Sequence, residues 1–400
     1  MRQEATAIKV SEAMKEVKAF EWEGDYKGAT RAALKEVIER GLNNARDEYL
    51  AELASRDSVE EDRRNGYYRR HLLSAVGDVE LKIPRTRSWS ARAALKELGR
   101  RTREVDQLIL GCFVLGLSTR KVATALFPIL GEKVSPSTVS RIAHQLDAAV
   151  LAYHRRPLKG RYRVLMFDAV VMKRKTGGGS QKRMVLVALG ITWEGKKEVI
   201  DFQVAKGESE GAWAKFFTAL VKRGLSGENS TSPPQEGVKL IVVDGGKGLL
   251  AAVDLVYPEV AVQRCWAHKT RNVVDKVKKV DQAAVKKDLL DISGATHRLA
   301  AEQAFGRFAR RWQGKYPKAV ACVKEDIESL LEFYVFPADW HKQVRTTNAI
   351  ERRFVEVRRR TRPMGVFSDR TSIERILFAI LMHENRKEGV GSLFLLTQDS

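Results

Sequence analysis

Apolar and polar positions divide the first part of the chain into a helical region and a short β segment. Residues 1–60 place apolar side chains at loosely helical spacings among charges, as in GATRAALKEVIERGLNNARDEYLAEL. Within residues 61–98, HLLSAVGDVELKIPR predicts two short strands around a Gly-Asp turn. The helical region could serve dimerisation or DNA contact, or it could be an ordinary core helix.

Residues 99–155 predict three helices joined by tight connections. The break at Gly116–Ser118 precedes a short helix that Ser118 would cap. A turn through Gly131 leads to a third helix opened by Ser135 and Pro136. This arrangement is typical of a helix-turn-helix, which also occurs in purely structural helical bundles. In a DNA-binding version, the side chains that could reach bases or phosphates are Ser137, Thr138, Ser140, Arg141 and His144.

From residue 160 onward, strand and helix patterns alternate. YRVLMFDAVVMKR, KRMVLVALGITWEG and KKEVIDFQVAKGE predict three strands joined by the turns TGGGSQ and WEGKK. The helix SEGAWAKFFTALVKRGL follows, and then VKLIVVDGG, KGLLAAVDLVY, VAVQRCW and AHKTRNVVDKVKK complete the order βββαβαβα. We expect a mixed sheet with helices on both faces, which is the element order of the ribonuclease H-like fold. Residues 160–274 would form the first part of this core, and residues 275–340 read as wholly helical.

Two of the predicted strands each carry one carboxylate. Asp244 ends an apolar strand and could cap the next helix, contact a ribose or phosphate, or bind a metal ion. Asp168 lies inside the apolar strand VLMFDAVVM, where burial of an unpaired charge is costly. In the expected topology the first and fourth strands are parallel neighbours, so the two acids converge and would repel each other without a cation. Metal binding is the better interpretation of the pair.

A third acid, Glu351, lies within RTTNAIERRFVEVRRRTRPMG in the final segment, residues 341–400. Ile350, Phe354 and Val357 form one apolar helical stripe beside it. Glu351 could neutralise the surrounding arginines, or it could close a capping box begun by Asn348. If this helix lies against DNA, its candidate phosphate contacts are Arg352, Arg353, Arg358 and Arg359.

The charge of the chain indicates the class of partner. Lys and Arg total 71 against 50 acids in 400 residues, a net charge of +21, which favours a polyanion such as DNA. No apolar run of membrane-spanning length or signal peptide is found, and three cysteines form no disulfide framework, so we expect a cytoplasmic, nucleoid-associated protein without a membrane partner. Basic clusters flank the β segment, and its candidate contacts to the DNA backbone are Arg63, Arg64, Arg69, Arg70, Arg85 and Arg87.

From about residue 60 to its C-terminus the chain resembles the Mutator-type transposases of bacterial insertion sequences, a branch of the DDE transposases. The motifs that carry the resemblance occur in order: RRNGYYRR…GDVELKIPRTR, FDAVV, VALGITWEGKKEVIDFQVAKGES…W…RGL, VVDGGKGL, QRCWAHKTRNV and RTTNAIERRFVEVRRRTRPMGVF. The resemblance implies that Asp168, Asp244 and Glu351 are the catalytic, metal-binding acids. It also implies an all-α insertion between Asp244 and Glu351. Arg345 departs from the pattern, since many relatives have tyrosine there.

Strand transfer by such an enzyme is phosphoryl transfer assisted by two Mg²⁺ ions, for which Mn²⁺ would substitute. We expect double-stranded DNA, both transposon ends and target, as the partner, and a homodimer on that DNA. The resemblance also points to Cys265 and His268 as the Cys-x-x-His element of the family. Three interpretations of this pair remain: half of a zinc site, a hydrogen bond that orients the active site, or plain packing.

Three other functions compete with that of a transposase. A DNA-binding regulator would keep the helix-turn-helix without the chemistry, although the intact triplet of acids argues against it. A nuclease acting on RNA in hybrids is compatible with the fold, but the helix-turn-helix and the basic charge favour duplex DNA. A structural chromatin-type protein would need the charge without the buried acids.

Overall fold

The computed structural model describes residues 26–55, 61–92, 95, 99–227 and 237–390 of the chain. The described residues up to Phe113, together with Ser118–Ile142, form one compact unit. Val114–Leu117 and the described residues from Ala143 onward form a second unit. The part of the predicted N-terminal helical region before residue 26 lies outside the described residues.

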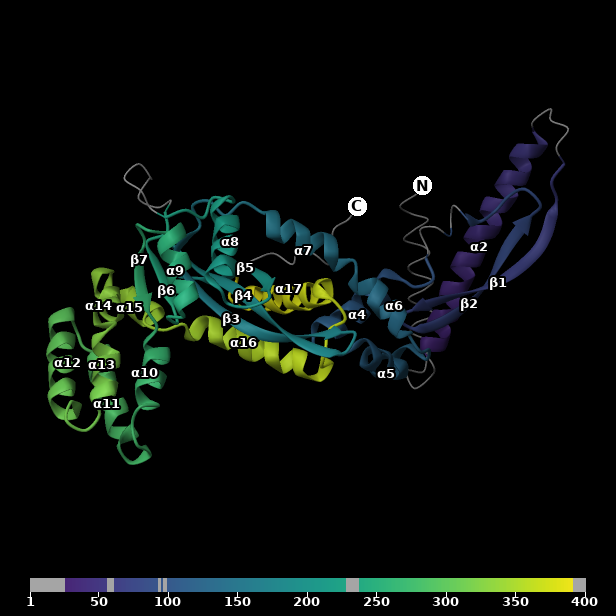
Figure 1. Cartoon of the computed structure of the whole chain (residues 1–400). Helices are drawn as coiled ribbons and strands as arrows, with labels where there is room; N and C mark the ends of the chain where they lie inside the picture. The colour runs from purple at the N-terminus through teal and green to yellow at the C-terminus, as the bar shows by residue number, and fades with distance from the viewer. Residues whose placement is uncertain (1–25, 56–60, 93–94, 96–98, 228–236, 391–400) are drawn as a thin grey trace. The chain divides into compact units, whose positions relative to one another are not determined.

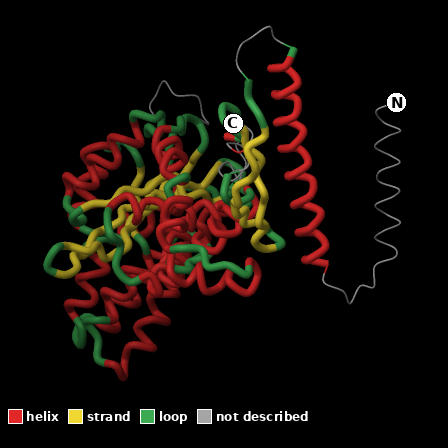
Figure 2. Tube along the Cα trace, turned by 90° about the vertical axis from the view of Figure 1, so that its right-hand side faces the viewer, coloured by secondary structure: helices red, strands yellow, loops and turns green. Residues whose placement is uncertain are grey.

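The first unit contains a long helix packed on a two-stranded sheet. Helix α2 (Tyr26–Ala54) lies beside the antiparallel strands β1 (Arg64–Ser74) and β2 (Gly77–Thr86), as Figure 2 shows. Leu42 of α2 is buried with Leu81 and Ile83 of β2. The predicted hairpin is confirmed, but its turn was placed wrongly. Ser74 pairs with Gly77, so the turn is Ala75–Val76 and the Gly-Asp pair lies inside β2.

Three short helices complete this unit where the sequence predicts them: α4 (Arg103–Val114), α5 (Thr119–Leu130) and α6 (Pro136–Ala143). The Ser118 side chain caps α5 by accepting a hydrogen bond from the N–H of Lys121 at 3.3 Å. Gly131 ends α5 in the left-handed conformation, with φ of 71°. Ser135 accepts a bond from the N–H of Thr138 at 3.1 Å and so satisfies the start of α6.

The second unit is built on a five-stranded mixed sheet of order β5-β4-β3-β6-β7. Strand β4 (Gly179–Thr192) is antiparallel to both of its neighbours, β3 (Tyr162–Thr176) and β5 (Lys197–Ala205), whereas β6 (Leu240–Val243) and β7 (Ala261–Arg264) run parallel to β3. Helices α8 (Glu210–Val221), α9 (Lys247–Val256) and α10 (Trp266–Val274) follow β5, β6 and β7. The predicted order βββαβαβα is thus confirmed.

Helices cover both faces of this sheet, as Figure 1 shows. On one face Phe167 and Leu186 are buried against Trp213 and Phe217 of α8 and Val253 of α9. The other face is covered by α16 (Asn348–Thr361) and α17 (Arg370–Lys387), which contact β3 and β5, and α7 (Leu146–Arg155) packs on α17. Because both faces are covered, the central strands are almost continuously apolar.

The predicted helical stretch between α10 and α16 is also confirmed. It contains α11 (Gln282–Ser293), α12 (Arg298–Trp312), α13 (Pro317–Lys324), α14 (Ile327–Leu331) and α15 (Ala338–Val344), with short 3₁₀ turns at Lys279–Asp281 and Glu332–Val335. Buried Lys269 of α10 binds this segment through an ion pair with Asp326 and a bond to the Cys322 carbonyl at 3.0 Å. In the described part of the chain, no helix is both long and apolar enough to cross a membrane.

We predict that Gly190→Ala destabilises the fold by about 1–3 kcal/mol, the usual cost of overpacking a core. A Cβ atom at Gly190 would lie 2.4 Å from the ring of Tyr162 and 2.7 Å from Ile200, both buried. Gly178→Ala, in the β3–β4 turn, is the matched control because no atom lies within 4 Å of its added methyl. Urea unfolding followed by circular dichroism measures both variants. Equal stability of the two would contradict the close packing described here.

Candidate active site

Two carboxylates leave the sheet side by side. The last parallel pair of β3 and β6 is Phe167 with Val243, so Asp168 and Asp244 follow at the same level of neighbouring strands. Each is half-buried and accepts a local backbone bond. Asp168 Oδ1 accepts from the N–H of Ala169 at 2.7 Å, and Asp244 Oδ1 accepts from the N–H of Gly246 at 2.9 Å. The predicted convergence of the two strands is therefore observed.

Helix capping does not explain Asp244. Helix α9 begins at Lys247, its N-cap position is Gly246, and no side chain caps it. The hydrogen bond that Gly246 N–H donates to Asp244 closes a tight turn before the helix instead. Asp244 therefore lies at the end of β6 without capping α9, and Gly246 occupies the N-cap position of that helix.

Glu351 reaches the same edge from α16. Its carboxylate accepts two hydrogen bonds from the guanidinium of Arg271 on α10, at 2.9 and 3.2 Å. The Nε2 atom of His268, one turn earlier on α10, lies 3.5 Å from Glu351 Oε1. The capping box suggested for Asn348 is not formed, because Thr347 is the N-cap of α16 and makes no side-chain cap bond.

One cluster could hold a metal ion among the residues that the structure describes. Ligand atoms of Asp168, His268 and Glu351 all lie within 4.8 Å of one another. Burial, together with the charges of Asp244 and Glu351, raises the pKa of Asp168 to about 7, against the opposing effects of Ala169 N–H and His268. Such mutual repulsion among carboxylates marks a place where a cation is favourable.

Cys265 and His268 are linked through Thr347 rather than through a four-ligand zinc site. The buried Thr347 hydroxyl donates to Cys265 Sγ at 3.2 Å and lies 3.3 Å from His268 Nδ1. Burial raises the pKa of Cys265, but hydrogen bonds with His268 and Thr347 outweigh it and lower the pKa overall. The same hydrogen bond with Cys265 has the opposite effect on the histidine: it raises the pKa of His268, although burial opposes this shift. The Nε2 atom of the histidine is thereby held toward Glu351.

Two residues of the site were missed in the sequence. Arg271 follows His268 by three positions on α10, a spacing that places both on one helix face, and this spacing was the available signal. Glu208, in the loop before α8, is the second. Burial raises its pKa, and the charge of Asp244 adds to that effect, so a fourth acid lies near Asp244.

The loop after β6 packs closely against a half-buried arginine, Arg264. A Cβ atom at Gly245 would lie 1.8 Å from the guanidinium of Arg264, and Gly245 has φ of 95°, so only glycine fits there. Arg264 in turn pairs with Asp326 of the helical segment at 3.2 Å. Asp244 is therefore positioned by a contact that runs from the helical segment through Arg264 to its neighbouring glycine.

Comparison with known proteins identifies the family. The family model for the Mutator family of transposases matches residues 5–389. The chain belongs to the Mutator family of transposases. It is 32% identical to the transposase for insertion sequence element ISRM5 of Rhizobium meliloti (strain 1021), over 90% of this chain and 88% of the relative. It is also 32% identical to the transposase for IS256 in transposon Tn4001 of Staphylococcus aureus, over 87% of this chain and 88% of the relative.

A third relative of this Mutator-family chain is the transposase for IS905 of Lactococcus lactis subsp. lactis (strain IL1403), at 32% identity over 81% of this chain and 80% of the relative. Among solved structures, a simian T-cell lymphotropic virus intasome in complex with a PP2A regulatory subunit matches at 10% identity. That match covers 59% of this chain and 71% of the other, with a TM-score of 0.17.

The arginines expected to contact DNA on the β1–β2 hairpin of this Mutator-family chain are mostly exposed. Three of them face acids on the same unit: Arg63 lies 2.8 Å from Glu61, Arg64 3.1 Å from Asp47, and Arg69 3.6 Å from Glu80. Arg70 is partly buried and donates to the carbonyl of Gly99, whereas Arg85 and Arg87 are exposed.

On α6, Arg141 and Ser137 are exposed, while Thr138 and Ser140 are half-buried. The hydroxyls of Ser137 and Thr138 lie 2.9 and 3.0 Å from Ser135 Oγ and therefore share in the helix-start network.

On α16 the four candidate arginines differ in exposure. Arg352, Arg358 and Arg359 are exposed, but Arg353 is 6% exposed and pairs with Glu388 at 2.7 Å. A buried guanidinium with an acid partner does not face a phosphate, so Arg353 serves the packing of α16. Arg359 lies 2.7 Å from Glu356 on its own helix.

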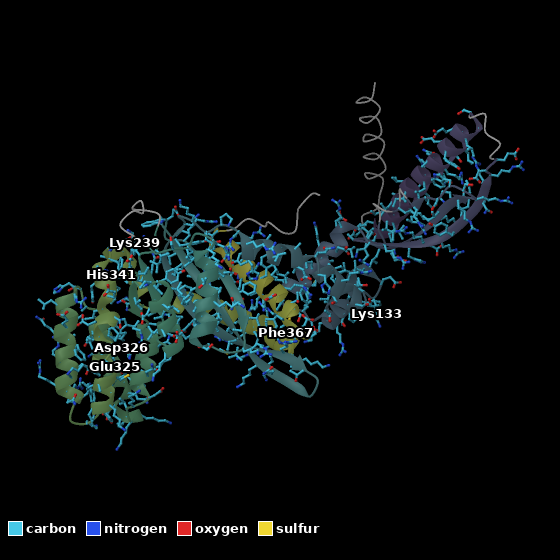
Figure 3. The ribbon with its side chains drawn as sticks, turned by 45° about the horizontal axis from the view of Figure 1, so that its top comes forward. Lys133, Lys239, Glu325, Asp326, His341 and Phe367 are labelled. Atoms are coloured by element: carbon cyan, nitrogen blue, oxygen red, sulfur yellow. The ribbon has the colours of Figure 1, made fainter. Side chains whose placement is uncertain are left out.

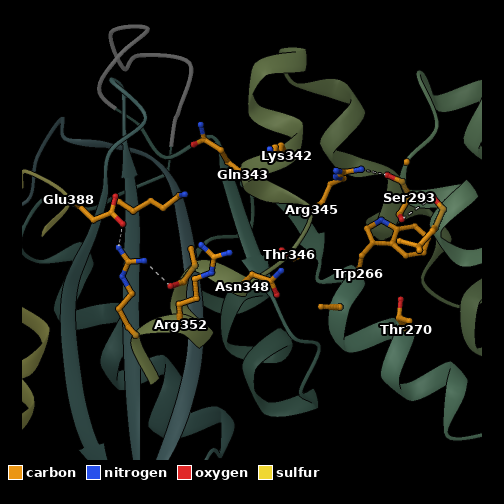
Figure 4. A pocket seen from close by; sticks show the side chains of 16 residues that line it. Trp266, Thr270, Ser293, Lys342, Gln343, Arg345, Thr346, Asn348, Arg352 and Glu388 are labelled. Atoms are coloured by element: carbon orange, nitrogen blue, oxygen red, sulfur yellow. Dashed lines mark hydrogen bonds and ion pairs between the residues drawn. The ribbon is translucent and has the colours of Figure 1, made fainter. Parts of the chain in front are cut away.

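A pocket of about 800 Å³ adjoins the site between α10, α11, α15 and α16 (Figure 4). Arg345, where the resemblance leads us to expect tyrosine, extends across it and donates to the carbonyl of Ser293 at 2.6 Å. Arg345 therefore links the segment before α16 to the end of α11. Other lining residues include Trp266, Thr270, Lys342, Gln343, Thr346, Asn348 and Arg352.

We predict that Thr347→Val lowers the free energy of unfolding by about 1–3 kcal/mol, because Cys265 and His268 both lose a buried hydroxyl partner. Thr347→Ser is the matched control, since it keeps the hydroxyl and should restore most of this loss. Chemical unfolding with tryptophan fluorescence measures the three proteins. A serine variant no more stable than the valine variant would show that packing of the methyl group, not hydrogen bonding, stabilises this position.

Proposed function

We propose that this Mutator-family chain is a DDE transposase. In this proposal it binds the terminal inverted repeats of an insertion sequence and catalyses metal-dependent cleavage and transfer of DNA strands. The observation that supports the proposal is that Asp168 lies at the level of Asp244 on the neighbouring strand and shares a cluster of possible metal ligands with Glu351 and His268. The mixed sheet, with its order βββαβαβα and its helical insertion, supports a ribonuclease H-like catalytic core.

The donor set fits a divalent cation of the magnesium type. Carboxylate oxygens are the protein ligands that Mg²⁺ prefers, and Asp168 and Glu351 offer theirs within 4.8 Å of each other. Asp244 joins them as the neighbouring strand end. A pair of such ions would offset charge on the phosphate and lower the pKa of the attacking water or 3′-hydroxyl. Mn²⁺ would serve in the same oxygen-rich site.

Neighbouring side chains orient these acids and partly balance their charge. Arg271 balances the charge of Glu351 and fixes its direction through two hydrogen bonds. Thr347 holds the ring of His268, whose other nitrogen faces the same carboxylate. Gly245 lets the guanidinium of Arg264 pack against the backbone beside Asp244, and the exposed Gly246 leaves room for a DNA strand to approach. The acids are thus oriented by the fold before substrate arrives.

Duplex DNA is the proposed partner because the chain carries a net charge of +21. Exposed Arg141 on α6 would contact the transposon end, and exposed Arg352, Arg358 and Arg359 on α16 would meet the backbone near the cut. A regulator without chemistry would have no need for three converging acids. A nuclease acting on hybrids would not need the helices α4, α5 and α6.

We predict that Asp168→Asn, Asp244→Asn and Glu351→Gln each abolish strand cleavage while DNA binding stays nearly unchanged, because each removes one charge from the metal-binding set. Asp254→Asn, at an exposed acid of α9, is the matched control and should cleave normally. Cleavage is measured on a labelled duplex carrying the terminal repeat with Mg²⁺ or Mn²⁺, and binding by fluorescence anisotropy. Near-normal cleavage by one of the three variants would remove that residue from the site.

We predict that Arg141→Ala weakens binding to the terminal repeat by about 1–3 kcal/mol and leaves binding to random duplex unchanged, as expected for a contact to a base. Arg120→Ala, at an exposed position on α5, controls for a general loss of charge. Titrations at several salt concentrations compare both DNAs. Equal losses on both would make Arg141 a phosphate contact, and no loss would give α6 a structural role.

A further inference from the structure

Strands β3 and β4 extend well past the level of the catalytic acids. Strand β6 pairs with β3 only as far as Phe167, yet β3 continues to Thr176 and remains paired with β4. We call this extension, residues 172–176 with 179–183, the basic arm. It projects as a hairpin beside the labelled Phe367 in Figure 3. Because the arm is a direct continuation of the strand that carries Asp168, its position relative to that acid is set by the strand itself.

The basic arm concentrates charge of one sign. The stretch from Ala169 to Trp193 contains no Asp or Glu, and its cations are Lys173, Arg174, Lys175, Lys182 and Arg183. The three lysines are exposed, and no residue of the described chain forms an ion pair with them. Lys173 lies directly opposite Lys182 in the antiparallel ladder, where like charges are destabilising.

Folding alone does not account for this arrangement. Lysines on an edge strand do discourage pairing between sheets. That purpose does not require two lysines directly opposite each other, and one edge of the arm is already covered. Phe367 donates its N–H to the carbonyl of Lys173 at 3.0 Å and accepts from the N–H of Lys175 at 2.7 Å. The repulsion between the lysines would be relieved by an anion bound on the arm.

Two further cations lie along the helix that carries Glu351, on the same side of α16 as that acid. On α16, Glu351, Val355 and Arg358 follow one another at helical spacings, and Arg362 continues the row just past the helix end. Both arginines are exposed. The segment after Arg362 leads to Phe367 on the arm, so the two rows are joined at their far ends.

The two rows reach the same distance from the acids. Lys173 lies five residues beyond Asp168, about 16 Å at a strand rise of about 3.3 Å per residue. Arg362 lies eleven residues beyond Glu351, again about 16 Å at about 1.5 Å per helical residue. One base pair of duplex DNA rises about 3.4 Å, so this distance corresponds to about five base pairs.

We propose that the basic arm, with Arg358 and Arg362, binds the backbone of duplex DNA about five to seven base pairs from the scissile phosphate. This inference rests on the proposed function, because it needs a phosphate at the three acids. The arm holds the flank of the DNA and so fixes the angle at which the duplex crosses the site. It contacts phosphates and reads no bases, because lysines on an exposed strand offer point charges without a fixed hydrogen-bond pattern.

The test is the triple variant Lys173→Gln, Lys175→Gln, Lys182→Gln, compared with the wild-type chain on the same terminal duplex. Each lost phosphate contact lowers the slope of log affinity against log salt by about 0.9. We expect the slope to fall by between about two and three. The matched control is Lys286→Gln, Lys287→Gln, Lys318→Gln, three exposed lysines of the helical segment, which should leave the slope unchanged.

Neutral methylphosphonate linkages locate the contact. Placed five to seven base pairs from the cut, they should weaken binding of the wild-type chain and have little further effect on the triple variant. Placed on the opposite side of the cut, they should affect both proteins equally. An unchanged slope in the triple variant, an equal fall in the control trio, or identical sensitivity of both proteins to the neutral linkages would overturn the proposal.

Failure of this inference can be told apart from failure of the proposed function. If the wild-type chain neither binds nor cleaves the terminal duplex, the function itself is wrong. If it binds and cleaves, and the acid variants lose cleavage, but the triple variant behaves as wild type at every salt concentration, only the role of the basic arm is wrong.

Discussion

The parallel pairing of β3 with β6 is the constraint on which the rest of the site depends. Phe167 and Val243 are buried in one core, and a slip of one residue would shift Asp168 and Asp244 apart by about 3.3 Å along the strands. The same register brings Asp168 and Asp244 to one edge, where their charges repel. Backbone N–H groups donate to both acids, and the Arg271 guanidinium donates to Glu351, which offsets part of the negative charge gathered there.

Local signals in the sequence were sufficient for much of this architecture. Strand alternation, helix caps at Ser118 and Ser135, and the turn at Gly131 are determined by neighbours a few residues away. The partners of Arg271 and Lys269 could not be found in this way, because Glu351 is 80 residues from the first and Asp326 is 57 residues from the second. Such pairs depend on how α10 is placed against α16 and the helical segment, which no local pattern encodes.

The arginines of α16 show a signal that was present but not used. Ile350, Phe354 and Val357 define the stripe that faces the sheet, and Arg353 and Arg360 fall within the same helical sector. Both are buried and paired with acids, Arg353 with Glu388 and Arg360 with Glu356. Helical angle, rather than residue type, therefore separates the arginines that pack from those that remain available for another molecule.

The contact from Asp326 through Arg264 to Gly245 limits how this chain could evolve. The helical segment between α10 and α16 is an insertion between two elements that pack on the core sheet. Its Asp326 nevertheless holds the arginine that packs against the loop of Asp244. If a different helical segment were inserted here, the Arg264 guanidinium would lose its ion pair with Asp326 unless the new segment placed an acid at the same position. Glycine at 245, arginine at 264 and an acid at 326 should therefore be gained or lost together, so that the insertion and the core are inherited as a single unit.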